Sequence, residues 1–408
     1  MHQGRPPREG VRAGAWYMSP MRRALLALAL SIVSCRHEAS ETRGASPGSS
    51  AVAMPSATAS AVPSSRAPVA EARAALSDRD FGRLVASLSE PAGKFPSDNF
   101  VSNETSWAHV LPALDDPRLH GGGYVGVGPE QSFSYLAVLR PELAFVIDIR
   151  RQNVIEHLVY KTLFERATSR ADFLARLCAR KTASDVPAAD ATIEQLAGWV
   201  QRLPKGETPS RAVVERAAEL GVELSKDDLA HLDATTKAFA DKCLALRYSM
   251  EGSARKYPSL GELLEVRDAA GKARSFLASE DAFRAVAELE RENRIVPLTG
   301  DLAGDGAMPR LAAELRARSL ELHVLYASNV EQYLFSPPAV WKRWTRNVAA
   351  MPWADGGRIL RVYFDQGRKH PAQVDGHRTV SMLAPADHFL ARAGGKGFAS
   401  WWDVATSD

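Results

Sequence analysis

Two glycines and an aspartate have a spacing that is typical of pockets for nucleotide-like cofactors. Gly126 and Gly128 end a short apolar run, and Asp148 ends a second one, twenty residues after Gly128. In such pockets the glycines let the backbone approach the ligand, and the acid accepts hydrogen bonds from both ribose hydroxyls. Arg150 suits either a clamp for an acidic group or the solvated start of a helix. The glycines would also suit a tight turn in an α/β sheet that binds nothing.

Polar residues after two later apolar runs extend this candidate site. Asp301 follows one run, and Ser328, Asn329 and Glu331 follow the next. The carboxyl ends of parallel strands share one edge of a sheet, and ligands bind in the crevice outside that edge. An acid after the third strand suits the exocyclic amine of a base. For Ser328 and Asn329, capping of a helix is the alternative to a catalytic role.

Residues 97–104 (SDNFVSNE) are unusually rich in hydrogen-bonding side chains for a loop that leads into a helix. One interpretation is capping, with Ser102 or Asn103 as the N-cap and Glu104 in the first helical turn. The other is that the loop crosses the mouth of the first strand and contacts a ligand. The side chains that would do so are Asp98, Asn99, Asn103 and Glu104.

A sheet must bring these residues together, and the hydrophobic pattern predicts one. Short apolar runs alternate with stretches of helical periodicity, which indicates a largely parallel sheet with helices on both faces. Residues 168–290 show helical periodicity and no convincing strand. We therefore expect a doubly wound, Rossmann-like α/β fold with a long helical insertion between strands 2 and 3. The expected strands are residues 124–128, 143–149, 294–301, 320–328, 357–365 and 378–383.

The order of elements and of polar residues resembles class I S-adenosylmethionine-dependent methyltransferases, over residues 121–165 and 293–365. The resemblance implies S-adenosylmethionine as cofactor. It implies two glycines along the methionine and ribose, an acid on the ribose, an acid facing the adenine, and an asparagine near the transferred methyl group. In that order the residues are Gly126 and Gly128, Asp148, Asp301, and Asn329. Asn99 and Asn103 of the polar loop join this cofactor-binding set.

Two positions depart from the methyltransferase pattern. An acid usually stands two residues before the first glycine, where this chain has Tyr124, and a third small residue is usual where it has Glu130 or Gln131. Methyl transfer depends mainly on positioning, with one base where the acceptor loses a proton. Glu331 and Glu104 are the candidates for that base.

A closer resemblance covers most of the ordered chain. Several sequence blocks look like those of an uncharacterised bacterial protein family, known from spirochaetes and other phyla. Members of that family are assigned a methyltransferase-like fold, so the resemblance implies a fold and not an activity. The blocks are FPSDNFVSNE, VGVGPEQSFSYLAVLRP, FVIDIRRQN, RSFLASEDAF, IVPLTGDLAG and LYASNVEQYLF.

Residues 1–35 have the features of an export signal. Arg22 and Arg23 precede the apolar run ALLALALSIV, which is too short to span a bilayer comfortably. The following Ser34-Cys35 resembles a bacterial lipobox, which implies lipidation of Cys35. Residues 36–70 are rich in Ser, Ala and Pro and predict a disordered linker before a folded domain at 71–408. We expect a lipid-anchored protein of the bacterial cell envelope, or a cytoplasmic one if the signal is not used.

Composition argues against several classes of function. The formal net charge is +3, but residues 1–34 carry five Arg and one Glu, so the rest of the chain is at −1. Without a basic stripe, nucleic acid is a poor candidate partner. The common metal-ligand and P-loop motifs are absent from the sequence, so no metal is expected. Cys178 and Cys243 fall in helical patterns and are equally compatible with buried thiols and with a disulfide.

Two functions fit these observations. The first is a membrane-tethered, methyltransferase-like enzyme that binds a small molecule, S-adenosylmethionine or a related nucleotide, and methylates an unknown acceptor. The second is a non-catalytic binding or interaction module on the same fold. S-adenosylmethionine is made in the cytoplasm, so a lipoprotein would meet little of it, and a fold alone does not decide between the two.

Overall fold

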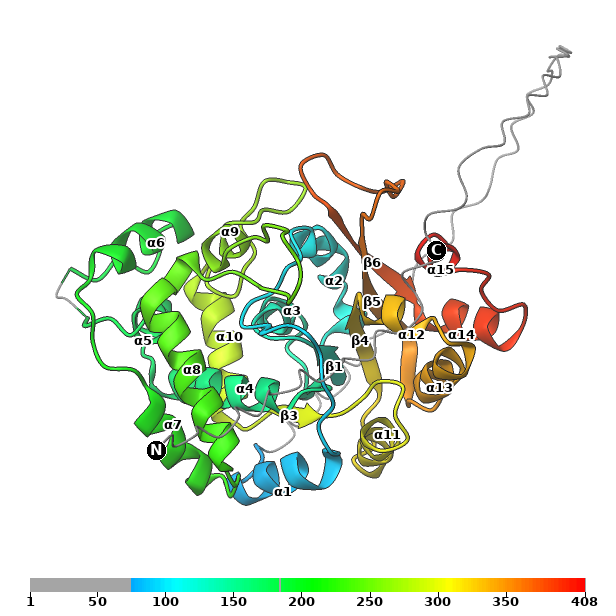
Figure 1. Ribbon diagram of the computed structural model, residues 1–408, viewed down its shortest axis with the longest axis horizontal. Coiled ribbons are helices and arrows are strands. Elements are labelled where there is room, and N and C mark those ends of the chain that lie inside the picture. The colour runs from blue at the N-terminus through cyan, green and yellow to red at the C-terminus, as the bar shows by residue number, and fades with distance from the viewer. Residues whose placement is uncertain (1–74, 183–184, 408) are drawn as a thin grey trace, which may run out of the picture. The chain divides into compact units, whose positions relative to one another are not determined.

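A six-stranded sheet forms the centre of the chain in a computed structural model that describes residues 75–182 and 185–407 (Figure 1). The strands are β1 (Gly123–Val127), β2 (Leu143–Asp148), β3 (Ile295–Thr299), β4 (Leu322–Ser328), β5 (Trp353–Phe364) and β6 (Thr379–Pro385). Their order is β3-β2-β1-β4-β5-β6, and all pairs are parallel except β5 with β6. The predicted α/β fold with a mostly parallel sheet is confirmed, its strand order is compatible with a Rossmann-like fold, and its last strand is antiparallel.

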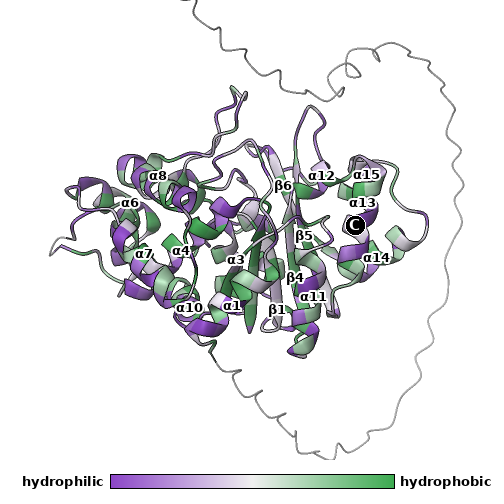
Figure 2. Ribbon diagram, turned by 60° about the horizontal axis from the view of Figure 1, so that its bottom comes forward, coloured by the Kyte–Doolittle hydropathy of each residue, from purple (hydrophilic) through white to green (hydrophobic). Residues whose placement is uncertain are grey.

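Helices cover the sheet on two sides. After β1 comes α3 (Gln131–Leu139), which the sequence predicts, and after β3 comes α11 (Ala307–Ala317). In Figure 1 the helices that precede β3 lie mainly on one side of the sheet, and α11 and α13 lie on the other. Figure 2 shows apolar residues concentrated on the strands and polar residues on the outer turns of the helices. The remaining helices of this part are α12 (Val330–Leu334), α13 (Pro338–Ala349), α14 (Ala386–Gly394) and α15 (Trp401–Ala405).

The described chain between β2 and β3 consists of helices joined by loops. It shows isolated β-bridges, such as Arg180 with Lys205, but no strand among the described residues. Helix α4 contacts β2 and β3, and α10 contacts both α3 and α4, so this segment packs directly on the sheet. The elements are α4 (Arg151–Arg166), α5 (Arg170–Leu177), α6 (Ile193–Arg202), α7 (Ser210–Glu219), α8 (Lys226–Lys242), η4 (Cys243–Ala245), α9 (Leu260–Leu264) and α10 (Glu280–Arg291).

Cys178 and Cys243 form a disulfide within this helical segment. Their Cα atoms are 4.7 Å apart, and 65 positions separate them in the sequence. Both cysteines are buried, one just after α5 and the other at the end of α8. The sequence left a disulfide and two free thiols equally open, and the structure decides for the disulfide.

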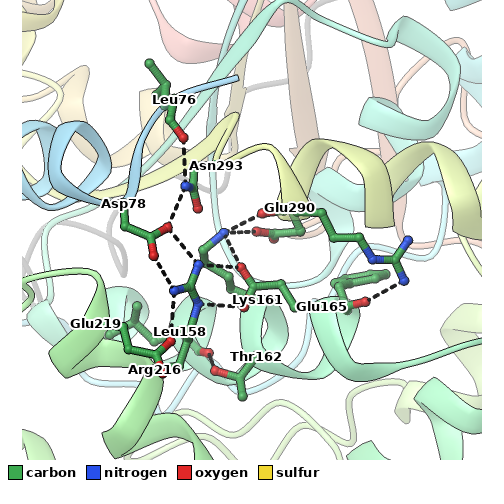
Figure 3. Close-up of polar contacts among 12 residues, drawn as sticks. Leu76, Asp78, Leu158, Lys161, Thr162, Glu165, Arg216, Glu219, Glu290 and Asn293 are labelled. Atoms are coloured by element: carbon green, nitrogen blue, oxygen red, sulfur yellow. Dashed lines mark hydrogen bonds and ion pairs between the residues drawn. The ribbon is translucent and has the colours of Figure 1, made fainter. Parts of the chain in front are cut away.

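Before the sheet, the chain forms α1 (Asp78–Leu88), η2 (Trp107–Val110), α2 (Leu111–Leu114) and η3 (Pro117–Leu119). The network in Figure 3 fastens α1 to the helical segment. Arg216 donates to both oxygens of Asp78, at 2.6 and 2.9 Å, and its Nε donates to Glu165 at 2.8 Å. The hydrogen bonds from Arg216 hold the pKa of Asp78 below its ordinary value. Asn293, just before β3, donates to the same carboxylate.

Three predictions fall on residues that lie outside the described part of the chain. They are the signal peptide at 1–35, lipidation at Cys35 and the linker at 36–70. Among the helices of residues 75–182 and 185–407, none is long and apolar enough to cross a membrane.

Candidate functional site

A pocket opens at the carboxyl ends of β1, β2, β3 and β4. It encloses about 1010 Å³ of space between atoms, including its open mouth. Strand β1 has β2 on one side and β4 on the other, so the strand order reverses direction here, which is where open α/β sheets bind ligands. The lining includes Phe95, Asn99, Asn103, Glu104, Gly128, Gln131, Asp148, Arg150, Tyr248, Asp301, Tyr326, Ser328, Asn329 and Tyr333.

Most of the residues that the sequence singles out do line this pocket. Three of the predicted residues, Asp98, Gly126 and Glu331, are not part of the lining. The residues brought together are Asn99, Asn103, Glu104, Gly128, Asp148, Asp301 and Asn329. The expected convergence at one sheet edge is therefore confirmed as geometry for these seven residues.

Gly126 makes room for a side chain of its own strand. A Cβ atom at this position would lie 2.4 Å from the Tyr124 hydroxyl oxygen, so the tyrosine ring fills the space beside the glycine. The Tyr124 hydroxyl donates to Ser132 Oγ at 3.1 Å. The geometry thus argues against Gly126 as a ligand contact. It also explains why a tyrosine stands where an acid is usual, because that position faces the core.

The backbone conformation at residue 128 requires glycine. Its φ of +88° lies in the left-handed region that glycine adopts without strain, and a Cβ atom here would meet no other atom within 4 Å. His157 of α4 holds the turn, with Nε2 3.1 Å from the Gly128 carbonyl oxygen. Because a carbonyl only accepts, Nε2 carries the proton. The open space beside Gly128 belongs to the pocket.

Glu331 forms a buried ion pair with Arg361 and is not part of the pocket lining. Its carboxylate accepts from Arg361 Nε at 2.7 Å and from Trp344 Nε1 at 3.1 Å, and the Glu331 side chain is fully buried. These contacts tie α12 to β5 and α13. The prediction that Glu331 acts as the base is not supported, because its carboxylate is held in this core contact.

Asp148 is bound on both oxygens by Arg150. The distances are 3.1 Å from Nε to Oδ1 and 2.8 Å from Nη2 to Oδ2. Arg150 Nη1 also donates to the carbonyl oxygens of Ser97 and Asp98, each at 3.0 Å. Arg150 is therefore a clamp, as one of its two interpretations anticipated, but it clamps an acid and a loop of its own chain.

Glu104 is a buried carboxylate on the pocket wall. Its oxygens accept hydrogen bonds from the Tyr326 hydroxyl at 2.7 Å and from the Ser328 hydroxyl. Burial raises the pKa of Glu104 to about 7, although both hydrogen bonds oppose this shift. A carboxyl group that titrates near neutral pH suits proton transfer. Ser328 itself has a φ of +51°, a strained conformation of the kind that clusters at functional sites.

The capping interpretation of the polar loop is wrong. The first helical turn after the loop starts at Trp107, and Ser106 precedes it, so neither Ser102 nor Asn103 caps a helix. The Ser102 backbone N–H instead donates to the Glu130 carboxylate at the start of α3, at 3.0 and 3.1 Å. This contact holds the loop across the end of β1, beside Glu104.

Asp301 sits in a turn that another acid organises. The carboxylate of Glu90 accepts from the backbone N–H groups of Asp301, at 2.6 Å, and of Ala307, at 2.9 Å. The Asp301 side chain accepts from the Ala303 N–H at 2.8 Å. Glu90 thus holds the backbone of the turn, and Asp301 lines the pocket.

Sequence reasoning missed several lining residues, including Phe95, Gln131, Tyr248, Tyr326 and Tyr333. Phe95 and Tyr333 meet edge to face, with ring centroids 5.5 Å apart, and Tyr248 comes from the helical segment between β2 and β3. Gln131 is buried on the wall, and its Nε2 has no hydrogen-bond partner. Only the position of Gln131, just after the glycine turn, offered a signal in the sequence.

The pocket lining is acidic. Its charged residues are three carboxylates, Glu104, Asp148 and Asp301, and one guanidinium, Arg150. Arg150 is already paired with Asp148, so two carboxylates lack a cationic partner in the lining. Within the described ranges, no three His, Cys, Asp or Glu side chains are grouped as metal ligands would be.

The fold and the pocket define a Rossmann-like α/β protein with a small-molecule-sized pocket at the switch point of its sheet. The chain belongs to the family described as "Domain of unknown function (DUF7790)", whose model matches residues 99–401. The matched region contains all six strands and the helical segment between β2 and β3. A search of the curated proteins finds no match to this chain.

Proposed function

We propose that the pocket binds S-adenosylmethionine, or a related phosphate-free adenosine compound, and that the protein is a methyltransferase-like enzyme. The observation that carries the proposal is an acidic pocket at the switch point of the sheet, with Gly128, Asp148 and Asp301 on successive strand ends. On this proposal residues 168–290 are a helical insertion in a class I methyltransferase fold, and Tyr248 is its contribution to the pocket.

The charges of the lining argue against cofactors that carry phosphate. A pyrophosphate is held by free N–H groups at a helix start and by cationic side chains. Arg150 is the one cationic residue of the described lining, and Asp148 neutralises it. The carboxylate of Glu130 is buried at the start of α3, where a dinucleotide would place its phosphates. S-adenosylmethionine has no phosphate and carries a positive sulfonium.

On this proposal the residues of the chain bind the cofactor, orient the acceptor and take up one proton. S-adenosylmethionine supplies a methyl group that already has its leaving group. Gly128 and Asp148 would hold the ribose side of the pocket, Asp301 the adenine, and Asn329 the region of the transferred methyl. Glu104 would accept the proton that the acceptor loses, because burial keeps the pKa of its carboxyl near neutral.

A thermal-shift screen tests the proposal. The protein should be stabilised by S-adenosylmethionine and by S-adenosylhomocysteine, with about 2.7 kcal/mol gained at a hundred times the dissociation constant. NAD and ATP at the same concentrations should give no shift, because the pocket lacks a free cation for their phosphates. A shift with NAD or ATP, and none with the two sulfur compounds, would replace this proposal with a phosphate-binding one.

A second function is a non-catalytic binding module, and one observation favours it. Both oxygens of Asp148 are held by Arg150, so a ribose would have to share them. If S-adenosylhomocysteine binds but no acceptor in a mixed metabolite extract becomes labelled from methyl-labelled S-adenosylmethionine, binding without catalysis is the better account.

We also propose a lipid anchor in the bacterial cell envelope, on the basis of the sequence around Cys35. The Cys178–Cys243 disulfide supports export, because disulfides persist mainly in oxidising compartments. Cys35→Ser should move the protein from the membrane fraction to the soluble fraction. Unchanged fractionation would contradict the anchor.

A further inference from the structure

We propose that the part of the pocket beside β4 binds the amine of a small organic cation, with Glu104 as its counter-ion, and that this amine is the methyl acceptor. The second half of this statement rests on the proposed function, whereas amine binding does not. The acceptor class would then be amines that carry an apolar or aromatic group.

The first observation is a carboxylate without a cation. Glu104 is 1% exposed and lines the pocket, and its side chain accepts hydrogen bonds from the hydroxyls of Tyr326 and Ser328. Among the described residues, no Lys, Arg or His forms a salt bridge with it. Hydroxyl groups donate to a carboxylate but do not neutralise it, and a buried charge is costly unless it is paired. A ligand ammonium would supply the missing charge.

A second, independent observation is an unpartnered amide on the same wall. Gln131 is 3% exposed, lines the pocket, and has no hydrogen-bond partner for Nε2. A buried polar atom of this kind costs about 1–3 kcal/mol unless something pairs with it. We infer that a polar group of a bound molecule completes this contact.

The third observation is an aromatic wall at the mouth of the pocket. Phe95 and Tyr333 contact each other edge to face, and Tyr333, on α12, is 48% exposed. Tyr248, which is buried, completes the wall. Aromatic faces attract ammonium groups, and they also accept the apolar part of an amine. The carboxylates of Glu104 and Asp301 in the lining would repel an anion.

On the proposed function, methyl transfer to the amine would need only the amine, the Glu104 carboxylate and S-adenosylmethionine. The amine first gives its ammonium proton to the Glu104 carboxylate. The nitrogen lone pair then attacks the methyl carbon, a C–N bond forms, and the C–S bond breaks with its electron pair going to sulfur. The products are the methylated amine and S-adenosylhomocysteine.

Three probes of similar size test the amine site directly. Phenethylamine, 2-phenylethanol and phenylacetate each have a phenyl ring and eight carbon atoms but carry an ammonium, a hydroxyl and a carboxylate head group, and each is titrated into the full protein by calorimetry. The amine should bind about tenfold more tightly than the alcohol, and the carboxylate should not bind. In Glu104→Gln the amine-to-alcohol ratio should fall below about threefold. Glu251→Gln, an exposed residue outside the lining, should keep the wild-type ratio.

The pH dependence gives a second readout that needs no variant. The charged and titratable groups around Glu104 are Glu130 behind it, Tyr124, Tyr135 and Tyr326. Amine binding should weaken as the pH falls from 8 to 6, because burial places the pKa of Glu104 at about 7. Equal binding of amine and alcohol, or no binding by any of the three probes, would overturn the amine proposal.

The two proposals can fail separately. A thermal shift with S-adenosylmethionine but no selectivity for the amine would leave the cofactor proposal standing and end the acceptor proposal. Selective amine binding without any shift by S-adenosylmethionine would end the methyltransferase proposal and leave a binding module for organic cations.

Discussion

The guanidinium of Arg150 is 2.8 Å from Oδ2 of Asp148 and holds this acid at the carboxyl end of β2. The same guanidinium donates to two carbonyl groups of the polar loop, at Ser97 and Asp98. One buried cation therefore joins the sheet edge, the first acid of the pocket and the loop that crosses its mouth. Loss of the Arg150 side chain would leave the largely buried Asp148 carboxylate without a cation, with only the backbone N–H of residue 150 as donor, and would leave the two carbonyl groups without theirs.

Replacement of Arg150 by Met should therefore destabilise the protein strongly. Breaking a buried ion pair by removing one partner costs about 3–5 kcal/mol. Arg118→Met is the matched control, because the side chain of Arg118 is 73% exposed and an exposed ion pair contributes little to stability. Urea denaturation measures both. Equal losses in the two variants would mean that the Arg150 clamp contributes little.

The packing of Tyr124 against Gly126 makes a second prediction. Gly126→Ala should cost about 1–3 kcal/mol, because the new methyl group would overlap the tyrosine ring. In a Tyr124→Val background the same substitution should cost much less, so the two changes should be non-additive. Gly394→Ala, where a Cβ atom meets nothing within 4 Å, should not lower the stability. Additive losses at residues 124 and 126 would contradict this packing.

The sheet could be predicted from the sequence because most of its strands are short apolar runs bounded by polar turns, although β5 starts at Trp353, before its predicted start at residue 357. The predicted runs at 143–149 and 320–328 became β2 (Leu143–Asp148) and β4 (Leu322–Ser328) with shifts of one or two residues. The convergence of Asp148, Asp301 and Asn329 followed from strand order alone. These predictions needed only the rule that parallel strands present their carboxyl ends at one edge.

Side-chain partners could not be predicted in the same way. Gly126 and Glu331 stand at positions that suit a ligand site, yet Gly126 packs under Tyr124 and Glu331 pairs with Arg361, thirty positions away in the sequence. The spacing of a residue in the sequence shows at which strand end it lies. It does not show which distant side chain packs against it or forms a hydrogen bond with it. Tyr248 was missed for the same reason, since nothing local links it to the sheet edge.

Glu104 should make the stability depend on pH in a defined direction. Burial raises its pKa from 4.5 to about 7 in the folded state, so between these values the unfolded chain loses its proton first. The contribution of Glu104 to the stability therefore falls as the pH rises from about 4.5 to about 7. Glu104→Gln removes this loss, so its stability relative to the wild type should rise by up to about 3 kcal/mol over that range. Denaturation curves at several pH values measure the difference, and parallel curves would contradict the assignment.

The disulfide predicts the behaviour of two of the three cysteines. In protein purified from an oxidising compartment, iodoacetamide should label neither Cys178 nor Cys243 until a reductant and denaturant are added. The double variant Cys178→Ser/Cys243→Ser should lose about 4 kcal/mol, since the bond closes a long loop in the unfolded chain. Labelling of both positions in the untreated protein, seen by mass spectrometry of its peptides, would mean that the bond is not formed.

The central claim is that a phosphate-free adenosine compound occupies the acidic pocket, and calorimetric titration with S-adenosylhomocysteine tests it most directly. The wild type should bind one molecule per chain, and Asp301→Asn should weaken binding about tenfold or more. Asp305→Asn, a 72% exposed carboxylate outside the lining, should bind as the wild type does. If the wild type shows no binding heat, or if both variants bind alike, the account of the pocket is wrong.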